Sequence, residues 1–249
     1  MVSLMSILFL GFFLGMRHAL DPDHVIAITT IVSRQKATIR AALIGVLWGI
    51  GHTFTILVVG AAIILFNLAI PARLGLSMEL AVGAMLILLG ILNLTGVLQW
   101  AHNRYTGHDH SNPDELITRV EDPAPNPGPV GSAVRALGLY NILRPLFVGI
   151  VHGLAGSAAV ALLVMTTIKD PRWALAYLLI FGFGTIAGMM IITAAISTPF
   201  VHTARKFSNW NRRMAVASGL LSLGFGLFVS YQIGFVDGLF TAHPTWTPR

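Results

Sequence analysis

The stretch Arg17-His18-Ala19-Leu20-Asp21-Pro22-Asp23-His24 places two histidines and two aspartates between apolar segments. Residues 4–16 before it are apolar but number only 13, whereas a helix that crosses the hydrocarbon core of a bilayer needs about 20. Apolar sequence resumes at 25–32. Pro22 lacks a backbone donor and disfavours helical dihedral angles at the residue before it. We therefore expect one membrane-spanning segment over residues 4–32, interrupted at Pro22.

The remainder of the chain has the composition of an integral membrane protein. Of its 249 residues, 55% are hydrophobic and 10% are charged, against about 25% charged in soluble domains. This composition excludes a soluble enzyme and a disordered chain, and the absence of cysteine excludes disulfides, thiolate metal sites and thiol redox chemistry. Five stretches of 23 to 32 residues lack Asp, Glu, Lys and Arg, and each can form a spanning helix: 41–72, 80–103, 145–168, 173–204 and 214–236.

The net charge of +6 is explained by membrane topology rather than by a nucleic-acid partner. With six spans, the loops after spans one, three and five carry 10 Lys and Arg residues, and the other side carries 4. The positive-inside rule then places the first group in the cytoplasm and both termini outside the cytoplasmic membrane. The third loop, 101–137, is rich in Pro, Asn, Asp and Gly, which predicts a flexible linker. Its histidines are His102, His108 and His110; a weak metal site there is an alternative to a solvated loop.

The two halves of the sequence resemble each other at an offset of 133 to 134 residues. His18-Ala19-Leu20 matches His152-Gly153-Leu154, and Trp48-Gly49-Ile50-Gly51-His52 matches Phe181-Gly182-Phe183-Gly184-Thr185. Since each copy has an odd number of spans, the second copy must cross the membrane in the opposite direction. We expect an all-α fold with a 3+3 inverted repeat: repeat one in 1–100, the loop in 101–137, and repeat two with a short tail in 138–249. Inverted repeats are typical of secondary transporters.

The polar cluster of the first span predicts a metal site. Ionisable side chains at membrane depth are unfavourable and usually functional. An unwound turn at Pro22 would let His18, Asp21, Asp23 and His24 converge, although an ideal helix would separate the two histidines by about 120°. Imidazole and carboxylate without thiolate suit divalent metals such as nickel, cobalt or zinc.

Residues of two other spans are expected to join this site. His52 is a further expected ligand, because its glycine-rich surroundings allow close helix contact. His152, which occupies the repeat position of His18, is expected to line the path with Thr53 and Ser157, and the two hydroxyls could instead bridge helices.

These residues resemble the nickel/cobalt transporter family of secondary permeases. Residues 17–24 match the family motif Arg-His-Ala-x-Asp-Ala-Asp-His apart from Pro22, and Gly51-His52-Thr53 is similar to its second motif. The acidic later motifs of the family are missing, and six expected spans replace eight, so the chain resembles more closely a shorter, urease-accessory-like branch. The resemblance implies transport of Ni²⁺ or Co²⁺, with His18, Asp21, Asp23, His24 and His52 central to recognition.

We therefore predict a secondary transporter for a divalent transition metal, with Ni²⁺ first and Co²⁺ second. The ion would be the transported substrate, with no tightly bound cofactor, no enzymatic activity and the lipid bilayer as surroundings. Two alternatives remain open at this point. One is an intramembrane zinc-dependent hydrolase, and the other is a metal-independent small-solute exporter in which the cluster relays protons. The oligomeric state does not follow from the sequence.

Overall fold

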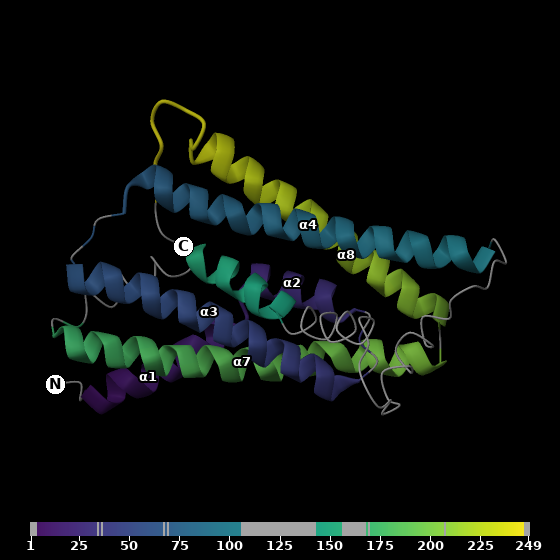
Figure 1. Ribbon diagram of the computed structural model, residues 1–249, viewed down its shortest axis with the longest axis horizontal. Coiled ribbons are helices and arrows are strands. Elements are labelled where there is room, and N and C mark those ends of the chain that lie inside the picture. The colour runs from purple at the N-terminus through teal and green to yellow at the C-terminus, as the bar shows by residue number, and fades with distance from the viewer. Residues whose placement is uncertain are drawn as a thin grey trace, which may run out of the picture.

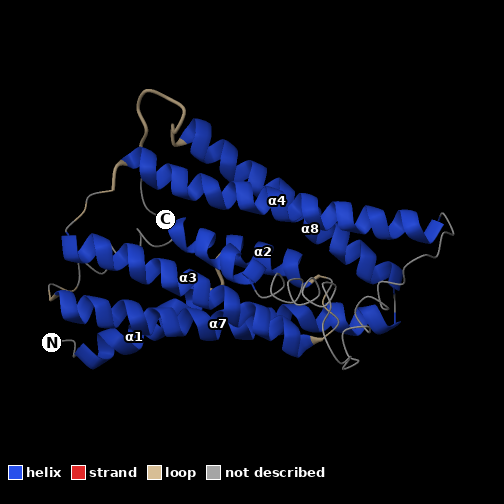
Figure 2. Ribbon diagram, viewed as in Figure 1, coloured by secondary structure: helices blue, strands red, loops and turns tan. Residues whose placement is uncertain are grey.

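The computed structural model describes residues 4–33, 35, 37–66, 68, 70–105, 143–155, 168, 170–206 and 208–246. Within these ranges the chain is helical and contains no strand, which confirms the all-α prediction (Figure 2). The helices are α1 (Leu4–His18), α2 (Pro22–Val32), α3 (Thr38–Phe66), α4 (Ala72–Tyr105), the helix Leu143–Ala155, α7 (Pro171–Lys206) and α8 (Ser208–Tyr231), followed by the π-helical turn η1 (Gln232–Val236).

Four described helices are long and apolar enough to cross a membrane: Thr38–Phe66, Ala72–Gly96, Pro171–His202 and Trp210–Val236. They correspond to the predicted second, third, fifth and sixth spans. The first predicted span consists of two short apolar helices, and its break lies where Pro22 predicts it. The fourth is described as Leu143–Ala155, and residues 156–167 lie outside the described part, as does nearly all of the predicted loop 101–137.

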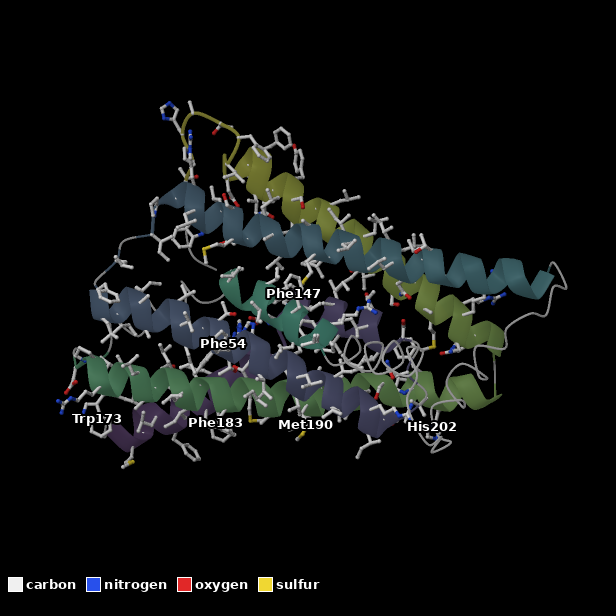
Figure 3. All side chains as sticks on the ribbon, in the orientation of Figure 1. Phe54, Phe147, Trp173, Phe183, Met190 and His202 are labelled. Carbon is white, nitrogen blue, oxygen red and sulfur yellow. The ribbon has the colours of Figure 1, made fainter. Side chains whose placement is uncertain are left out.

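The outer surface of these helices is apolar, and much of their polar surface lies inside. Phe54, Phe147 and Phe183, on three different helices, each expose more than half of their surface (Figure 3). In contrast, Thr185 and Thr193 are fully buried. A soluble protein would expose far fewer large apolar side chains, so this distribution belongs to a multi-pass membrane protein whose helices face lipid.

The helices form two groups that meet at α2. In the first group α1 and α3 pack against α7, and the helix Leu143–Ala155 packs against α3; in the second, α4 packs along α8 (Figure 1). α2 contacts α4, α7 and α8, so it lies at the junction. The apolar core there joins side chains of every group, including Ile28, Trp48, Leu86, Val148 and Met189. This arrangement buries one face of α2, which begins with His24 and continues through Ala27, Ile28, Thr30 and Val32, while Pro22 at its start stays exposed.

Two helix pairs in the first group make the same close contact. Gly15 of α1 lies against the carbonyl oxygen of Phe181 in α7, and Gly149 lies against the carbonyl oxygen of Trp48 in α3. Gly149 follows Gly15 by 134 positions, and Phe181 follows Trp48 by 133. In both places a side chain on the glycine would overlap the facing backbone, so the two pairs need glycine for the same reason.

A second contact recurs with the roles of the helices reversed. Gly184 of α7 lies against the carbonyl oxygen of Phe12 in α1, and Gly51 of α3 lies against the carbonyl oxygen of Leu146. The glycines are 133 positions apart, and the residues that they face are 134 apart. The packing of α1 on α7 therefore has its counterpart in the packing of the helix Leu143–Ala155 on α3.

Candidate metal centre

The break between α1 and α2 brings together the four polar residues of the sequence cluster. α1 ends at His18, and Asp21 occupies the N-cap position of α2 with an extended ψ of 142° and no side-chain capping hydrogen bond. Pro22 is the first residue of α2, a position at which the missing N–H has no helical acceptor. The backbone N–H of Asp21 donates to the carbonyl of His18, which closes a tight turn. The polar residues, which a continuous helix would distribute around its surface, thus lie on either side of the turn that joins α1 to α2.

His18 has a different partner on each ring nitrogen. Its Nδ1 lies 2.6 Å from Oδ2 of Asp21, and its Nε2 lies 3.1 Å from Nε2 of His52. The carboxylate favours a proton on Nδ1 and leaves Nε2 as the lone-pair nitrogen. Histidine ligands of metals usually donate their second N–H to a carboxylate in this way, which fixes the ring and raises its basicity. Asp21 is therefore placed to orient His18 rather than to bind an ion directly.

His24 lies at the centre of the cluster and is 1% exposed. Neither of its ring nitrogens has a hydrogen-bond partner among the described residues, although Nδ1 approaches Oδ1 of Asp23 at 3.4 Å. A buried polar group without a partner is rare and costs about 1–3 kcal/mol. The ring therefore lacks the partners that a structural histidine in a core normally has.

His152 reaches the cluster from the second half of the chain. Its Nε2 lies 2.8 Å from Oδ2 of Asp23, and the residue is 1% exposed. The Nδ1 atoms of His152 and His52 are buried and, within the described part of the structure, also lack hydrogen-bond partners. With the two nitrogens of His24, four buried imidazole nitrogens are thus without a partner.

The cluster can be divided into two groups of possible metal ligands, His18–His24–His52 and Asp23–His24–His152. Within each group, one ligand atom per residue lies within 4.8 Å of the others. Two nitrogens bound to one ion at about 2.1 Å would be about 3.0 Å apart at a right angle and about 3.4 Å apart at the tetrahedral angle. The 3.1 Å between the Nε2 atoms of His18 and His52 falls between these values. The arrangement can hold a divalent cation with little movement.

The walls of the site are apolar and aromatic. The ring of Trp48 lies 6.1 Å from that of His24 and 5.6 Å from that of His152, and Phe181 lies 5.6 Å from His18. Trp48 is fully buried, and its Nε1 has no partner among the described residues. Sequence reasoning did not identify Trp48 as part of the site. The sequence signal that could have identified Trp48 is its position four residues, or one helical turn, before His52, which places both side chains on the same face of α3.

The remaining predicted residues have different positions. Thr53 donates a hydrogen bond to the carbonyl of Gly182, 3.2 Å away, so it bridges α3 and α7 and does not reach the histidines by a described contact. Ser157, His108 and His110 lie outside the described residues, and of His102 only the backbone is described. His152, expected to line the path, lies in direct contact with Asp23.

Comparisons with known proteins agree with this chemistry. The family model of a high-affinity nickel-transport protein matches residues 4–239. The urease accessory protein UreH of Bacillus sp. (strain TB-90) is 39% identical over 242 residues, which cover 96% of each chain. The chloroplast proteins FOR GROWTH AND FERTILITY 2 and 1 of Arabidopsis thaliana are 25% and 24% identical over 90% and 87% of this chain, which spans 56% of the length of each. No solved structure matches the chain.

Proposed function

Because the chain belongs to the high-affinity nickel-transport family, we propose that it carries Ni²⁺, and secondarily Co²⁺, across the cytoplasmic membrane through the His–Asp cluster. Family membership makes the protein a metal-ion permease rather than an enzyme, as the sequence predicted, and the similarity to UreH confirms the resemblance to the shorter branch. The observation that carries the site assignment is the pair of converging ligand groups, whose ligand atoms lie within 4.8 Å of one another, around a buried His24 ring with no hydrogen-bond partner among the described residues. Each neutral imidazole offers one nitrogen lone pair, and rings gathered in this way can replace the water shell of an ion.

In the proposed site, His18, Asp23 and His24 are the central ligands, and His52 completes the set. Asp23 supplies negative charge, which offsets the unfavourable transfer of a dication into a low-dielectric interior. Asp21 holds Nδ1 of His18, so the ring presents Nε2 to the ion. The C-terminal end of α1 adds the negative end of a helix dipole. Imidazole nitrogens suit nickel and cobalt better than manganese or magnesium.

We further propose six spans in a 3+3 inverted repeat, with halves 1–100 and 138–249 joined by the cytoplasmic loop 101–137. The two pairs of recurring glycine contacts support this arrangement, because the same residues of each half pack against the other half. Transport would proceed by alternating access, with the two halves rocking about the break between α1 and α2. Both termini would lie outside, since the loops richer in Lys and Arg then face the cytoplasm.

Nickel uptake by the purified full-length protein in proteoliposomes tests the site. We expect His24→Asn to reduce uptake by at least about 100-fold, since losing a ligand should exceed the 10–100-fold effect of losing an outer partner. The matched control is His202→Asn, an exposed histidine on α7 (Figure 3), which should leave uptake unchanged. Equal uptake by the two variants would refute the assignment. Competition by Co²⁺, Zn²⁺ and Mn²⁺ in the same vesicles would then rank the metals.

A further inference from the structure

The two groups of ligands in the cluster share a single residue, His24. The first group, His18–His24–His52, contains three neutral imidazoles, and all of them come from the first half of the chain. The second group, Asp23–His24–His152, contains a carboxylate, and His152 comes from the second half. The difference matters because the first group uses ligands of one half only, whereas the second group exists only where residues of the two halves meet.

The spacing of the rings in the first group fits one ion. An imidazole centroid lies about 3.2 Å from a metal bound at about 2.1 Å, so two rings on one ion have centroids about 4.5 Å apart at a right angle and about 5.2 Å apart at the tetrahedral angle. The centroids of His18 and His24 are 4.8 Å apart, and each is 5.1 Å from that of His52. One cation can therefore be bound by all three rings.

His152 does not fit this same position. Its centroid is 6.2 Å from that of His52, which would require the two rings to bind from nearly opposite sides of an ion. It is 4.3 Å from the centroid of His24, and its Nε2 is 2.8 Å from Oδ2 of Asp23. These separations fit two ligands at about a right angle on a second ion position, close to Asp23.

We propose that the cluster contains two adjoining positions for one divalent transition-metal ion, that His24 is a ligand in both, and that His152 is a ligand in the second. This inference rests on the proposed function. Both nitrogens of His24 are buried and have no hydrogen-bond partner within the described ranges, whereas His18 and His152 each have one nitrogen next to a carboxylate. A neutral imidazole has one lone pair, so a ring that binds through each nitrogen in turn must shift its proton to the nitrogen that the ion leaves, and the His24 ring can do so because neither nitrogen is held by a partner in the described structure.

The two positions differ in a way that suits transport. Three neutral nitrogens bind a borderline metal without compensating its charge, and the second position exchanges one nitrogen for a carboxylate oxygen. Transport requires binding that is favourable enough for entry but weak enough for release, which adjoining sites achieve by passing the ion between them. Since His152 and Asp23 belong to different halves, the second position forms only while those halves are in contact. The step between positions is thereby linked to the movement of the halves.

Cobalt titration of the purified full-length protein, followed by visible absorption and by equilibrium dialysis, tests the two positions. Variants are His52→Asn for the first position, His152→Asn for the second and His24→Asn for both, with His202→Asn as the control for handling and folding. We expect His52→Asn and His152→Asn each to weaken Co²⁺ binding by about 10–100-fold, less than the loss of the shared ligand His24, because each variant keeps the other position. The Co²⁺ spectra of these two variants should differ from each other, because each variant keeps a different set of ligands. A loss of packing alone would weaken binding without changing the ligands, and the two spectra would then be the same. His24→Asn should bind least.

The double variants make the test sharper. The double variant His18→Asn/His52→Asn removes the first position and should keep a cobalt site with at most two nitrogens and one oxygen from the protein. The double variant Asp23→Asn/His152→Asn removes the second position and should keep a site with three nitrogens. X-ray absorption distinguishes these ligand sets. A wild-type affinity, spectrum and uptake in His152→Asn would overturn the second position while leaving the proposed function intact. Absence of Co²⁺ and Ni²⁺ binding by the wild type would overturn the proposed function itself.

Discussion

The pair α1–α2 and the helix Leu143–Ala155 occupy matching places in the two halves but differ in chemistry. Both pack against a long helix of the other half through a glycine, Gly15 in one and Gly149 in the other. Both carry a histidine at the corresponding position, His18 and His152. Asp21-Pro22-Asp23-His24 in the first half, however, corresponds to Ala155-Gly156-Ser157-Ala158 in the second.

The same asymmetry is present where the long helices cross. His52 of α3 corresponds to Thr185 of α7 at the offset of 133, and both residues are fully buried. Thr185 donates to the carbonyl of Phe181 in its own helix, whereas His52 faces His18. The comparison indicates that small residues set the packing in both halves, while the proposed metal ligands lie in the first half except for His152. Packing and binding can therefore be perturbed separately.

The largest effect is expected from Asp23→Asn. The amide keeps the shape and a hydrogen-bonding group for His152 but removes the negative charge that balances a dication. We expect nickel uptake to fall by about 100-fold, equivalent to about 2.7 kcal/mol, with normal expression and thermal stability. The measurement is initial uptake in proteoliposomes across a range of Ni²⁺ concentrations. The control is Asp170→Asn at the exposed start of α7, and a comparable loss there would contradict the role given to Asp23.

The next largest effect concerns packing and should be similar in both halves. In Gly51→Ala and Gly184→Ala the new methyl group would overlap a facing carbonyl oxygen, of Leu146 and Phe12 respectively. We expect each to destabilise the protein by about 1–3 kcal/mol, seen as a lower midpoint of thermal unfolding in detergent. Gly224→Ala is the control, since a methyl group there meets no atom of the described residues within 4 Å. Strongly unequal losses at Gly51 and Gly184 would weaken the inverted repeat.

Much of the fold could be predicted because the signals for it are local. Runs without charge identify the long helices, and Pro22 identifies the break, since both depend on adjacent residues. α4 begins at Ala72 rather than near residue 80, because Arg73 and Glu79 lie in the first turns of the helix, where charged side chains can reach polar surroundings.

The site was predicted less completely because its geometry is tertiary. Pattern alone placed Asp21 and Asp23 in one cluster, but their different partners, His18 and His152, depend on how α2 meets the second half. The offset that relates His152 to His18 indicated a role for this residue, yet it did not identify Asp23 as its neighbour. Trp48 belongs to no chemical motif that would have predicted its packing against the histidines of the cluster.

A smaller effect on binding is expected from Asp21→Asn. Its side chain is about half exposed and acts on the ion through His18, so the variant should leave every proposed ligand in place. We expect an approximately 10-fold weaker Ni²⁺ affinity, about 1.4 kcal/mol, at the low end of the 10–100-fold effect of removing an outer partner. Cobalt spectra should show an unchanged number of nitrogen ligands. A loss as large as that of Asp23→Asn would mean that Asp21 binds the ion itself.

The smallest effect is expected from Pro22→Ala. Proline at the first helical position stabilises mainly by restricting the unfolded chain, which contributes about 0.4–1 kcal/mol. The turn that joins α1 to α2 has other support, since Ala19 is fully buried and packs on Gly188 of α7, and Asp21 remains in contact with His18. The variant should therefore lower the free energy of unfolding by about 0.4–1 kcal/mol and reduce Ni²⁺ affinity by no more than about two- to fivefold.

Pro199→Ala in α7 is the matched control for this last variant, because that proline lies inside a continuous helix and forms no part of the cluster. It should leave Ni²⁺ affinity unchanged. If Pro22→Ala instead abolished binding as completely as His24→Asn, the proline alone would be holding α1 and α2 apart, and a single continuous helix would be the stable state without it. A modest loss would show that the tertiary contacts of α1 with α7 keep the ligands converged, so that the packing common to both halves also maintains the proposed metal site.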